Sequence, residues 1–218
     1  MGSFLYPMLD QTPSSTADRT ALLADLARSA QAKAVESRQT TDRVLDQQSG
    51  PLEQAASAMA TAFSCGGRLF CFGNGGSATD AAGVSALFAT PGASGRALPA
   101  RSLSADTAVL TALANDIGVS ALFTRQLIAF GRPGDIALGL STSGGSANVL
   151  TAFGEGRRRG MLTIGLAGYA GGAMADCVEL DHCLSVDAQS VHRTQEAQSA
   201  LAYALCVAVR RNLAKEQP

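Results

Sequence analysis

Residues 135–146 read DIALGLSTSGGS, and this stretch indicates both the fold class and the kind of site. Asp135–Leu140 is an almost entirely apolar run, which is typical of a strand buried on both faces of a parallel sheet. Ser141–Ser146 then brings hydroxyls and two glycines before a helical segment that ends near Gly160. The stretch therefore predicts a strand, a loop and a helix in succession.

The same order occurs earlier in the chain, where Arg68–Phe72 is followed by GNGGS at 73–77 and an Ala-rich helix. We expect further strands at 97–103 and 161–166 and one or two within 177–186, and further helices at 52–63, 106–114, 120–130 and 191–213. This alternation predicts an α/β fold with a doubly wound, flavodoxin-like parallel sheet flanked by helices. Ligands of such sheets bind outside the carboxyl ends of the strands, where both Gly/Ser loops fall.

The part before this sheet has a different character. Residues 1–18 contain Pro and Ser and predict a flexible N-terminal arm. Residues 19–50 predict an N-terminal helix, periodic to about residue 45 and closed by Gly50-Pro51, and residues 51–218 predict the α/β domain. The helix carries an apolar stripe of Leu22, Leu23, Leu26, Ala30 and Ala34, which a single small domain need not cover, so we expect a homo-oligomer and, more specifically, a tetramer.

Composition excludes several classes of protein. The 218 residues carry a formal net charge of -1 and no basic stripe, which argues against direct nucleic-acid binding. The five cysteines form no CxxC pair, so we expect free thiols in a reducing cytoplasm rather than a zinc site. No apolar run is long enough to span a membrane, and the first residues show no signal peptide, which predicts a cytoplasmic protein.

The chemistry of the 141–146 loop suits a phosphate. Ser141, Thr142, Ser143 and Ser146 offer hydroxyls, the glycines allow close approach, and the following helix presents free amides and a positive dipole end. The loop holds no Lys or Arg and no Walker sequence, so backbone amides would balance the charge. An ordinary Ser-rich loop with Ser146 as the helix N-cap remains the alternative.

The 73–77 loop allows two interpretations. Its glycines fit a tight turn close to a ligand, and Asn74 and Ser77 supply polar side chains. A dinucleotide fingerprint would match with Ala78 in the last position. That fingerprint also needs an acid about 20 residues on, where 99–103 reads PARSL, so a nicotinamide cofactor is disfavoured.

Five segments together resemble the SIS (sugar isomerase) family, and within it the branch of phosphoheptose isomerase and the initiator-associating protein DiaA. They are FGNGGS at 72–77, LAND at 113–116, GRPGD at 131–135, STSGGSAN at 141–148 and TQE at 194–196. The resemblance covers residues 25–214. It implies that 51–218 is a SIS domain, that members are mostly homotetramers, and that the sugar is lined by Asn74, Gly75, Ser77, Asn115, Asp116 and Gln195.

The resemblance also shows where this chain departs from the isomerases, which use a Glu base, a His acid and in some members a zinc ion. Leu87 stands at the base position, Tyr203 at the acid position and Gly83 at a zinc ligand's position, so no zinc is expected. Asp80 lies seven residues from Leu87, about two helical turns away, so it would not reach the same point. The remaining weak candidates for proton transfer are His192, Glu196 and Tyr203. We interpret His182 as a surface or core residue without a catalytic role.

Two functions therefore stay open. The first is a sugar-phosphate protein resembling phosphoheptose isomerase, with a heptose phosphate as ligand and doubtful isomerase activity. The second is a DiaA-like, non-catalytic oligomeric adaptor or regulator, although no feature of the sequence marks a surface for a replication initiator.

Overall fold

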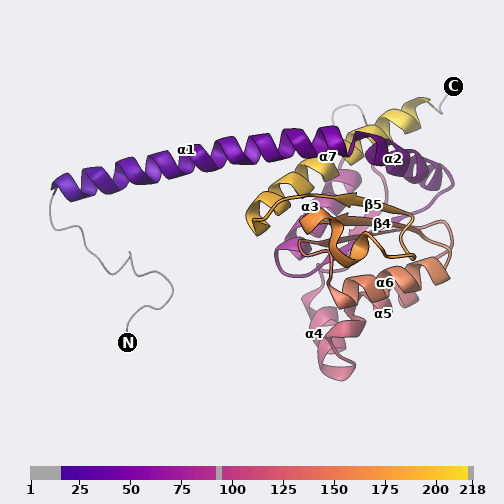
Figure 1. Ribbon diagram of the computed structural model, residues 1–218. Helices are drawn as coiled ribbons and strands as arrows, with labels where there is room; N and C mark the ends of the chain where they lie inside the picture. Colours follow the sequence, from indigo (N-terminus) through magenta and orange to yellow (C-terminus); the bar gives the residue numbers. More distant parts are fainter. Residues whose placement is uncertain (1–15, 92–94, 216–218) are drawn as a thin grey trace. The chain divides into compact units, whose positions relative to one another are not determined.

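The computed structural model describes residues 16–91 and 95–215, and the chain divides into two units, residues 1–39 and 40–218 (Figure 1). The expected N-terminal arm at 1–18 falls almost entirely outside the described residues. Helix α1 spans Thr16–Gln47, and α2 spans Ser49–Ser64. Gly50 and Pro51, which were expected to close the first helix, instead lie in the first turn of α2, where a proline is tolerated.

A five-stranded parallel sheet forms the centre of the second unit (Figure 1). Its strands lie in the order β2-β1-β3-β4-β5, and each pair of neighbours is parallel. The predicted α/β fold with a parallel sheet is confirmed. The strands are β1 (Leu69–Gly73), β2 (Ala100–Ser102), β3 (Ile136–Ser141), β4 (Leu162–Ala167) and β5 (His182–Ser185).

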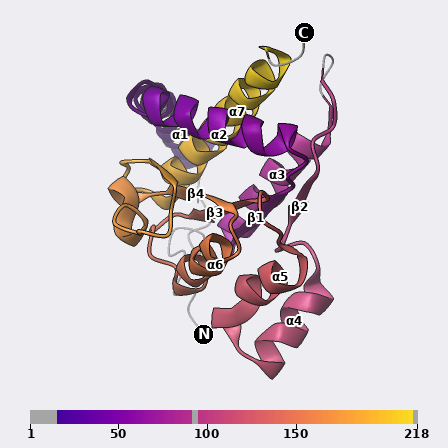
Figure 2. The same cartoon turned by 90° about the vertical axis from the view of Figure 1, so that its right-hand side faces the viewer.

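Helices cover both faces of the sheet (Figure 2). One face packs against α2, α3 (Gly76–Ala89) and α7 (Val191–Lys215). The core there is mostly aliphatic, with Met59, Leu138 and Leu205 fully buried, and it includes the stacked rings of Phe63 and Phe88. The other face packs against α5 (Leu122–Phe130) and α6 (Ala147–Arg158) around a cluster of Phe72, Phe123 and Phe153. Helix α4 (Thr107–Asp116) contributes no buried side chain.

The region after β4 differs most from expectation. The segment 177–186, interpreted as one or two strands, holds the single short strand β5. His182, expected to follow a strand, is the first residue of β5. A 3-10 segment, η3 (Tyr169–Met174), which the sequence did not predict, precedes it. A second short turn, η2 (Val119–Ala121), leads directly into α5.

The segment 131–135 has a structural role. Asp135 is 3% exposed and its carboxylate accepts hydrogen bonds from the Arg68 guanidinium and from the backbone amides of Arg68 and Arg132. This pairing raises the pKa of Arg68. A buried carboxylate with several donors is satisfied, so the GRPGD motif fixes the entry into β3 rather than offering a ligand group.

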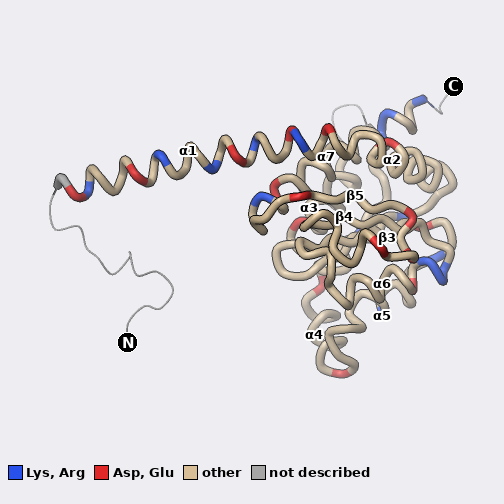
Figure 3. Tube along the Cα trace, in the orientation of Figure 1, with Lys and Arg blue, Asp and Glu red and all other residues tan. Residues whose placement is uncertain are grey.

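The described residues of the first unit lie on α1. Figure 3 shows basic and acidic residues spaced along this helix. Its apolar side chains are exposed as well, with Leu22 at 45%, Leu26 at 54% and Val35 at 53%. No helix in the two described ranges is long and apolar enough to cross a membrane.

Candidate functional site

The two Gly/Ser loops lie next to each other because β1 and β3 are neighbouring parallel strands, with Gly73 opposite Leu140. A pair of carboxamides joins them. Asn74 Nδ2 donates to Asn148 Oδ1 at 2.8 Å, and Asn148 Nδ2 donates back to Asn74 Oδ1 at 2.9 Å. This reciprocal pair holds the loop after β1 against the first turn of α6, so the two loops form one polar edge.

Hydroxyl groups bond to one another within the 141–146 loop. Ser141 Oγ lies 2.9 Å from Ser146 Oγ and 3.3 Å from Ser143 Oγ, and Ser143 Oγ accepts from the amide of Gly145. Ser146 is the N-cap of α6, but its side chain makes no capping bond to the helix. The hydroxyl that would satisfy the helix is turned toward Ser141. The amides of Val149 and Leu150 donate to the carbonyl oxygen of Ser146, both at 3.0 Å. The amides of Ala147 and Asn148 have no acceptor inside the helix and are therefore left for a ligand.

A second element supports the loop from below. Gly144 has φ 63°, and a Cβ there would lie 2.1 Å from the carbonyl oxygen of Gly171. The carbonyl oxygen of Gly144 accepts a hydrogen bond from the amide of Met174 at 2.9 Å. Segment η3 contains several residues with positive φ, among them Tyr169 and Ala170. Residues other than glycine rarely adopt this backbone conformation. The loop thus rests on a backbone-to-backbone contact that only glycine allows.

Gln195 approaches the 73–77 loop from α7. It is half-buried, and its Nε2 donates to Asp80 Oδ2 at 2.8 Å. A Cβ on Gly76 would lie 2.4 Å from the same Nε2, so the side chain lies directly on the start of α3. The structure therefore brings Gln195, Asp80 and the 73–77 loop together. Ser77, also expected to line the sugar, is 5% exposed at the same helix start.

Asn115 and Asp116 lie at the end of α4 and are exposed. The amide of Asn115 donates to the carboxylate of Asp116 at 2.8 Å. Their link to the loops is indirect: the carbonyl oxygen of Val119, three residues further on, accepts from Asn148 Nδ2 at 3.4 Å. The turn after α4 therefore borders the polar edge, while these two side chains do not contact it directly.

Comparison with known proteins assigns this arrangement to a family. A family model described as the SIS domain matches residues 34–168. The chain belongs to the SIS family. Phosphoheptose isomerase of Roseiflexus sp. strain RS-1 is 41% identical over 175 residues, which are 80% of this chain and 88% of that protein.

Solved structures of SIS proteins agree. The phosphoheptose isomerase of Neisseria gonorrhoeae has a TM-score of 0.75 at 35% identity, over 86% of this chain and 98% of that one. The phosphoheptose isomerase of Francisella tularensis has a TM-score of 0.79 at 29% identity, over 85% and 98%. The chain is thus a SIS protein similar to phosphoheptose isomerases.

The residues at the positions that the SIS resemblance assigns to base and acid lie on neighbouring helices. Helix α7 runs alongside α3, since Gln195 meets Asp80, and further along both helices Cys206 Sγ donates to the carbonyl oxygen of Leu87. The side chain of Leu87 is 36% exposed and that of Tyr203 is 61% exposed. Gly83 has open space around the place of a Cβ.

These positions do not fit a metal ion. Leu87 and Gly83 have no donor atom, and Tyr203 supplies a phenol rather than an imidazole. Nor do three His, Cys, Asp or Glu side chains cluster tightly enough to hold a metal anywhere in the described ranges. Of the weak candidates for proton transfer, His192 is exposed in the first turn of α7, and Glu196 pairs with Arg193 at 2.9 Å.

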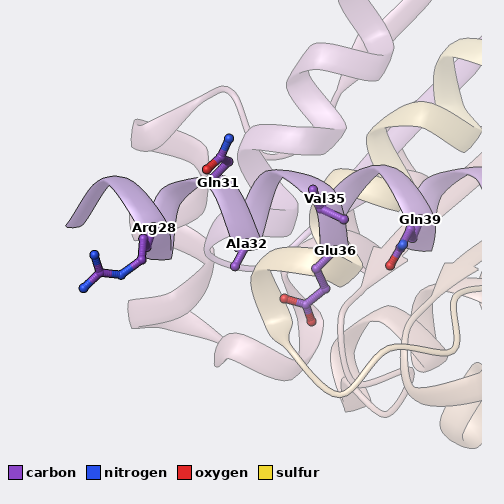
Figure 4. Close-up of a pocket in the computed structure, with 6 residues that line it drawn as sticks. All are labelled: Arg28, Gln31, Ala32, Val35, Glu36 and Gln39. Atoms are coloured by element: carbon purple, nitrogen blue, oxygen red, sulfur yellow. The ribbon is translucent and has the colours of Figure 1, made fainter. Parts of the chain in front are cut away.

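Two surface hollows lie outside these loops. One, of about 440 Å³, is lined by six residues from successive turns of α1 (Figure 4). Because these side chains come from one face of a single helix, they cannot enclose a small ligand. The other, of about 500 Å³, lies over α3 and the edge strand β2 and is lined by Ser85, Arg101 and Asp106 among others. Neither lining contains a residue of the two Gly/Ser loops.

The cysteines are all free thiols, as the sequence predicts. Cys71 and Cys206 are buried, and burial raises the pKa of the Cys71 thiol. Cys65 is exposed.

Sequence reasoning missed two residues of this region. Asn148 stands in the STSGGSAN motif, but the sequence does not predict its pairing with Asn74. Gln198, which contacts the 141–146 loop from behind, was not singled out at all. A signal was present for Gln198, since it is a polar residue in the apolar face of α7, three residues after Gln195.

Proposed function

We propose that this SIS protein binds a phosphorylated sugar. The phosphate lies against Ser141, Thr142, Ser143 and Ser146 and the amides of α6. The sugar extends over Asn74, Gly75 and Ser77 toward Gln195, with Asn115 and Asp116 at the rim. The observation that carries this proposal is the Ser146 hydroxyl, which bonds to Ser141 instead of capping α6 and so leaves the helix amides to an anion.

A heptose phosphate is the ligand that we favour, because the similar proteins over most of the chain are named phosphoheptose isomerases. Sedoheptulose 7-phosphate is therefore the first compound to test. Its terminal phosphate and its chain of hydroxyls match a site that offers hydroxyls and amides at one end and carboxamides at the other.

We further propose that turnover is absent or very weak and that zinc does not restore it. Interconversion of a ketose and an aldose needs a base and an acid at the reacting carbons. Leu87 cannot move a proton, and Tyr203 has a phenol whose reference pKa is about 10. Loss of one such group costs a factor of roughly 10²–10⁴, and here both positions are changed.

A second candidate function is a non-catalytic regulator or adaptor that responds to the sugar phosphate. The observation that favours it is the exposed apolar strip of Leu87, Tyr203 and Val207 on α3 and α7. Exposed apolar and aromatic side chains in place of acid and base suit a contact with protein better than they suit catalysis.

A ligand screen tests the binding proposal. Thermal shifts are measured with sedoheptulose 7-phosphate, hexose phosphates and pentose phosphates, with the unphosphorylated sugars as controls. We expect stabilisation by phosphorylated sugars only. A protein that no phosphosugar stabilises would contradict the proposal.

A turnover assay on each ligand found then separates the two candidates. If the protein is a damaged isomerase, Leu87→Glu combined with Tyr203→His restores some turnover. If it is a regulator, the double variant keeps binding and gains little activity. Wild-type turnover on the order of 1–10³ s⁻¹ would show that the catalytic groups lie elsewhere, with His192 the first to examine.

A further inference from the structure

Gln198 lies on the buried side of α7 with none of its surface exposed. Its Nε2 donates to the carbonyl oxygen of Leu166 in β4 at 3.0 Å and to that of Ser141 at 3.4 Å. Its Oε1 is buried and has no hydrogen-bond partner among the described residues. A buried side chain that uses only one end of its amide needs a reason beyond packing.

The carbonyl oxygen of Ser141 receives hydrogen bonds from three parts of the fold. The amide of Gly144 donates at 3.2 Å and closes the turn of the phosphate loop, and the amide of Gly168 donates at 3.1 Å from the end of β4. Gln198 adds the donor from α7. One atom therefore fixes the loop, the neighbouring strand and the helix relative to one another.

Thr194, one turn before Gln198, packs under the same region. Its Oγ1 is also buried and has no partner in the described part of the chain. A Cβ on Gly168 would lie 2.5 Å from Thr194 Cγ2 and 2.0 Å from the carbonyl oxygen of Thr142. Helix α7 thus places two polar side chains beneath the loop.

An apolar side chain of similar size would fill the position of Gln198 at a lower desolvation cost, because the buried Oε1 has no hydrogen-bond partner among the described residues. What only the amide supplies is the donor to the two carbonyl oxygens. We propose that Gln198 is a positioning residue for the phosphate-binding loop. By holding the carbonyl of Ser141, it fixes the turn whose amides and hydroxyls face the ligand. This inference rests on the proposed function, since it presumes that the loop binds phosphate.

The experiment compares two buried glutamines. Gln198→Met keeps the size of the side chain and removes the donor. Gln126→Met is the matched control, because Gln126 on α5 is 3% exposed and its Nε2 also donates to two carbonyl oxygens, those of Leu103 at 2.8 Å and Leu122 at 3.1 Å. Two quantities are measured: the dissociation constant for inorganic phosphate by calorimetry, and amide hydrogen exchange of the 141–150 segment without ligand.

We expect both variants to lower the melting temperature, and only Gln198→Met to weaken phosphate binding, by about tenfold, and to speed exchange in the 141–150 segment. An unchanged dissociation constant and unchanged exchange in Gln198→Met would overturn the inference, as would equal weakening by Gln126→Met. If Gln198→Met does not fold, Gln198→Asn is measured instead, since its shorter amide cannot reach both carbonyl oxygens. If the wild-type protein binds no phosphate, the proposed function fails, and the exchange data alone decide the role of Gln198.

Discussion

The hydroxyl groups of the 141–146 loop are bonded to one another before any ligand arrives. Ser141 is 2% exposed and lies between Ser143 and Ser146, so its hydroxyl fixes the directions of both neighbours. Such preorganisation lowers the entropy that a ligand has to overcome on binding. If the loop binds a phosphate as proposed, we therefore expect the buried Ser141 to contribute to binding through the positions of Ser143 and Ser146.

Replacing Ser141 and Ser143 together with alanine tests this arrangement. The double variant removes two hydroxyls and releases Ser146, so we expect it to abolish the thermal shift produced by a phosphosugar. Ser57→Ala, on the exposed side of α2, is the control and keeps the shift. A double variant that shifts as much as the wild-type protein would disprove phosphate binding at this loop.

Two adjacent glycines offer a sharper comparison. Gly144→Ala places a Cβ 2.1 Å from the carbonyl oxygen of Gly171 in a backbone with positive φ, so we expect a loss of about 1–3 kcal/mol or more in the free energy of unfolding. At Gly145 the nearest atom to a new Cβ is Ser143 Oγ, at 3.8 Å. Gly145→Ala should stay within about 0.5 kcal/mol. Urea unfolding measures both, and equal stabilities would mean that η3 does not support the loop.

The polar residues of the site differ in how far the sequence could predict them. Ser141 and Ser143 stand in a local pattern of strand, loop and helix, which is readable from neighbouring residues alone. Asn148 pairs with a residue 74 positions away, and Gln198 reaches a carbonyl 57 positions away. Such contacts depend on the order of strands in the sheet, which no local pattern encodes.

The pattern of apolar residues predicts the central strands and the helices that pack against the sheet. The apolar runs of β1, β3 and β4 lie within one residue of their expected bounds. No periodic pattern indicates segment η3, whose Gly171 and Gly172 pack against Gly144, a residue far from them in the sequence. The edge strand β2 is shorter than the expected 97–103, and it has only one neighbour to pair with. The short strand β5 lies within the expected segment 177–186.

Arg210 links α7 to the end of α3, since its guanidinium donates to the carbonyl oxygens of Leu87, Phe88, Thr90 and Arg96. These oxygens at and beyond the end of α3 would otherwise lack intrahelical donors. We expect Arg210→Met to lower the free energy of unfolding by about 1–3 kcal/mol. Arg211→Met, which removes an exposed pair with Glu53, should cost less than about 1 kcal/mol. Equal losses in urea unfolding would show that Arg210 acts only as a surface charge.

The exposed apolar stripe on α1 bears on the oligomeric state of the protein. Most of the stability of a helix in a protein comes from packing of its apolar face. A long helix whose apolar side chains stay exposed lacks that contribution. We propose that a second copy of the chain covers Leu22 and Leu26, and that the assembly is a homotetramer. The apolar chemistry of the stripe matches itself, as symmetric association requires.

Light scattering at micromolar concentration tests this assembly. We expect the mass of a tetramer for the wild-type protein and a smaller species for Leu26→Glu, which places a charge in the stripe. Ala24→Glu carries the same charge on the opposite side of the helix and should leave the mass unchanged. A wild-type monomer would exclude the proposed assembly.

The composition of the two Gly/Ser loops has a consequence for how a ligand arrives. Neither loop contains Lys or Arg, and the carboxylate of Asp80 lies beside Gln195. Under the proposed function, the field that would hold a phosphate there comes from amide dipoles, whose effect is confined to about one helical turn. Approaching anions are therefore not steered from a distance, and a change in ionic strength should alter the association rate little, unlike at a site built on arginine or lysine.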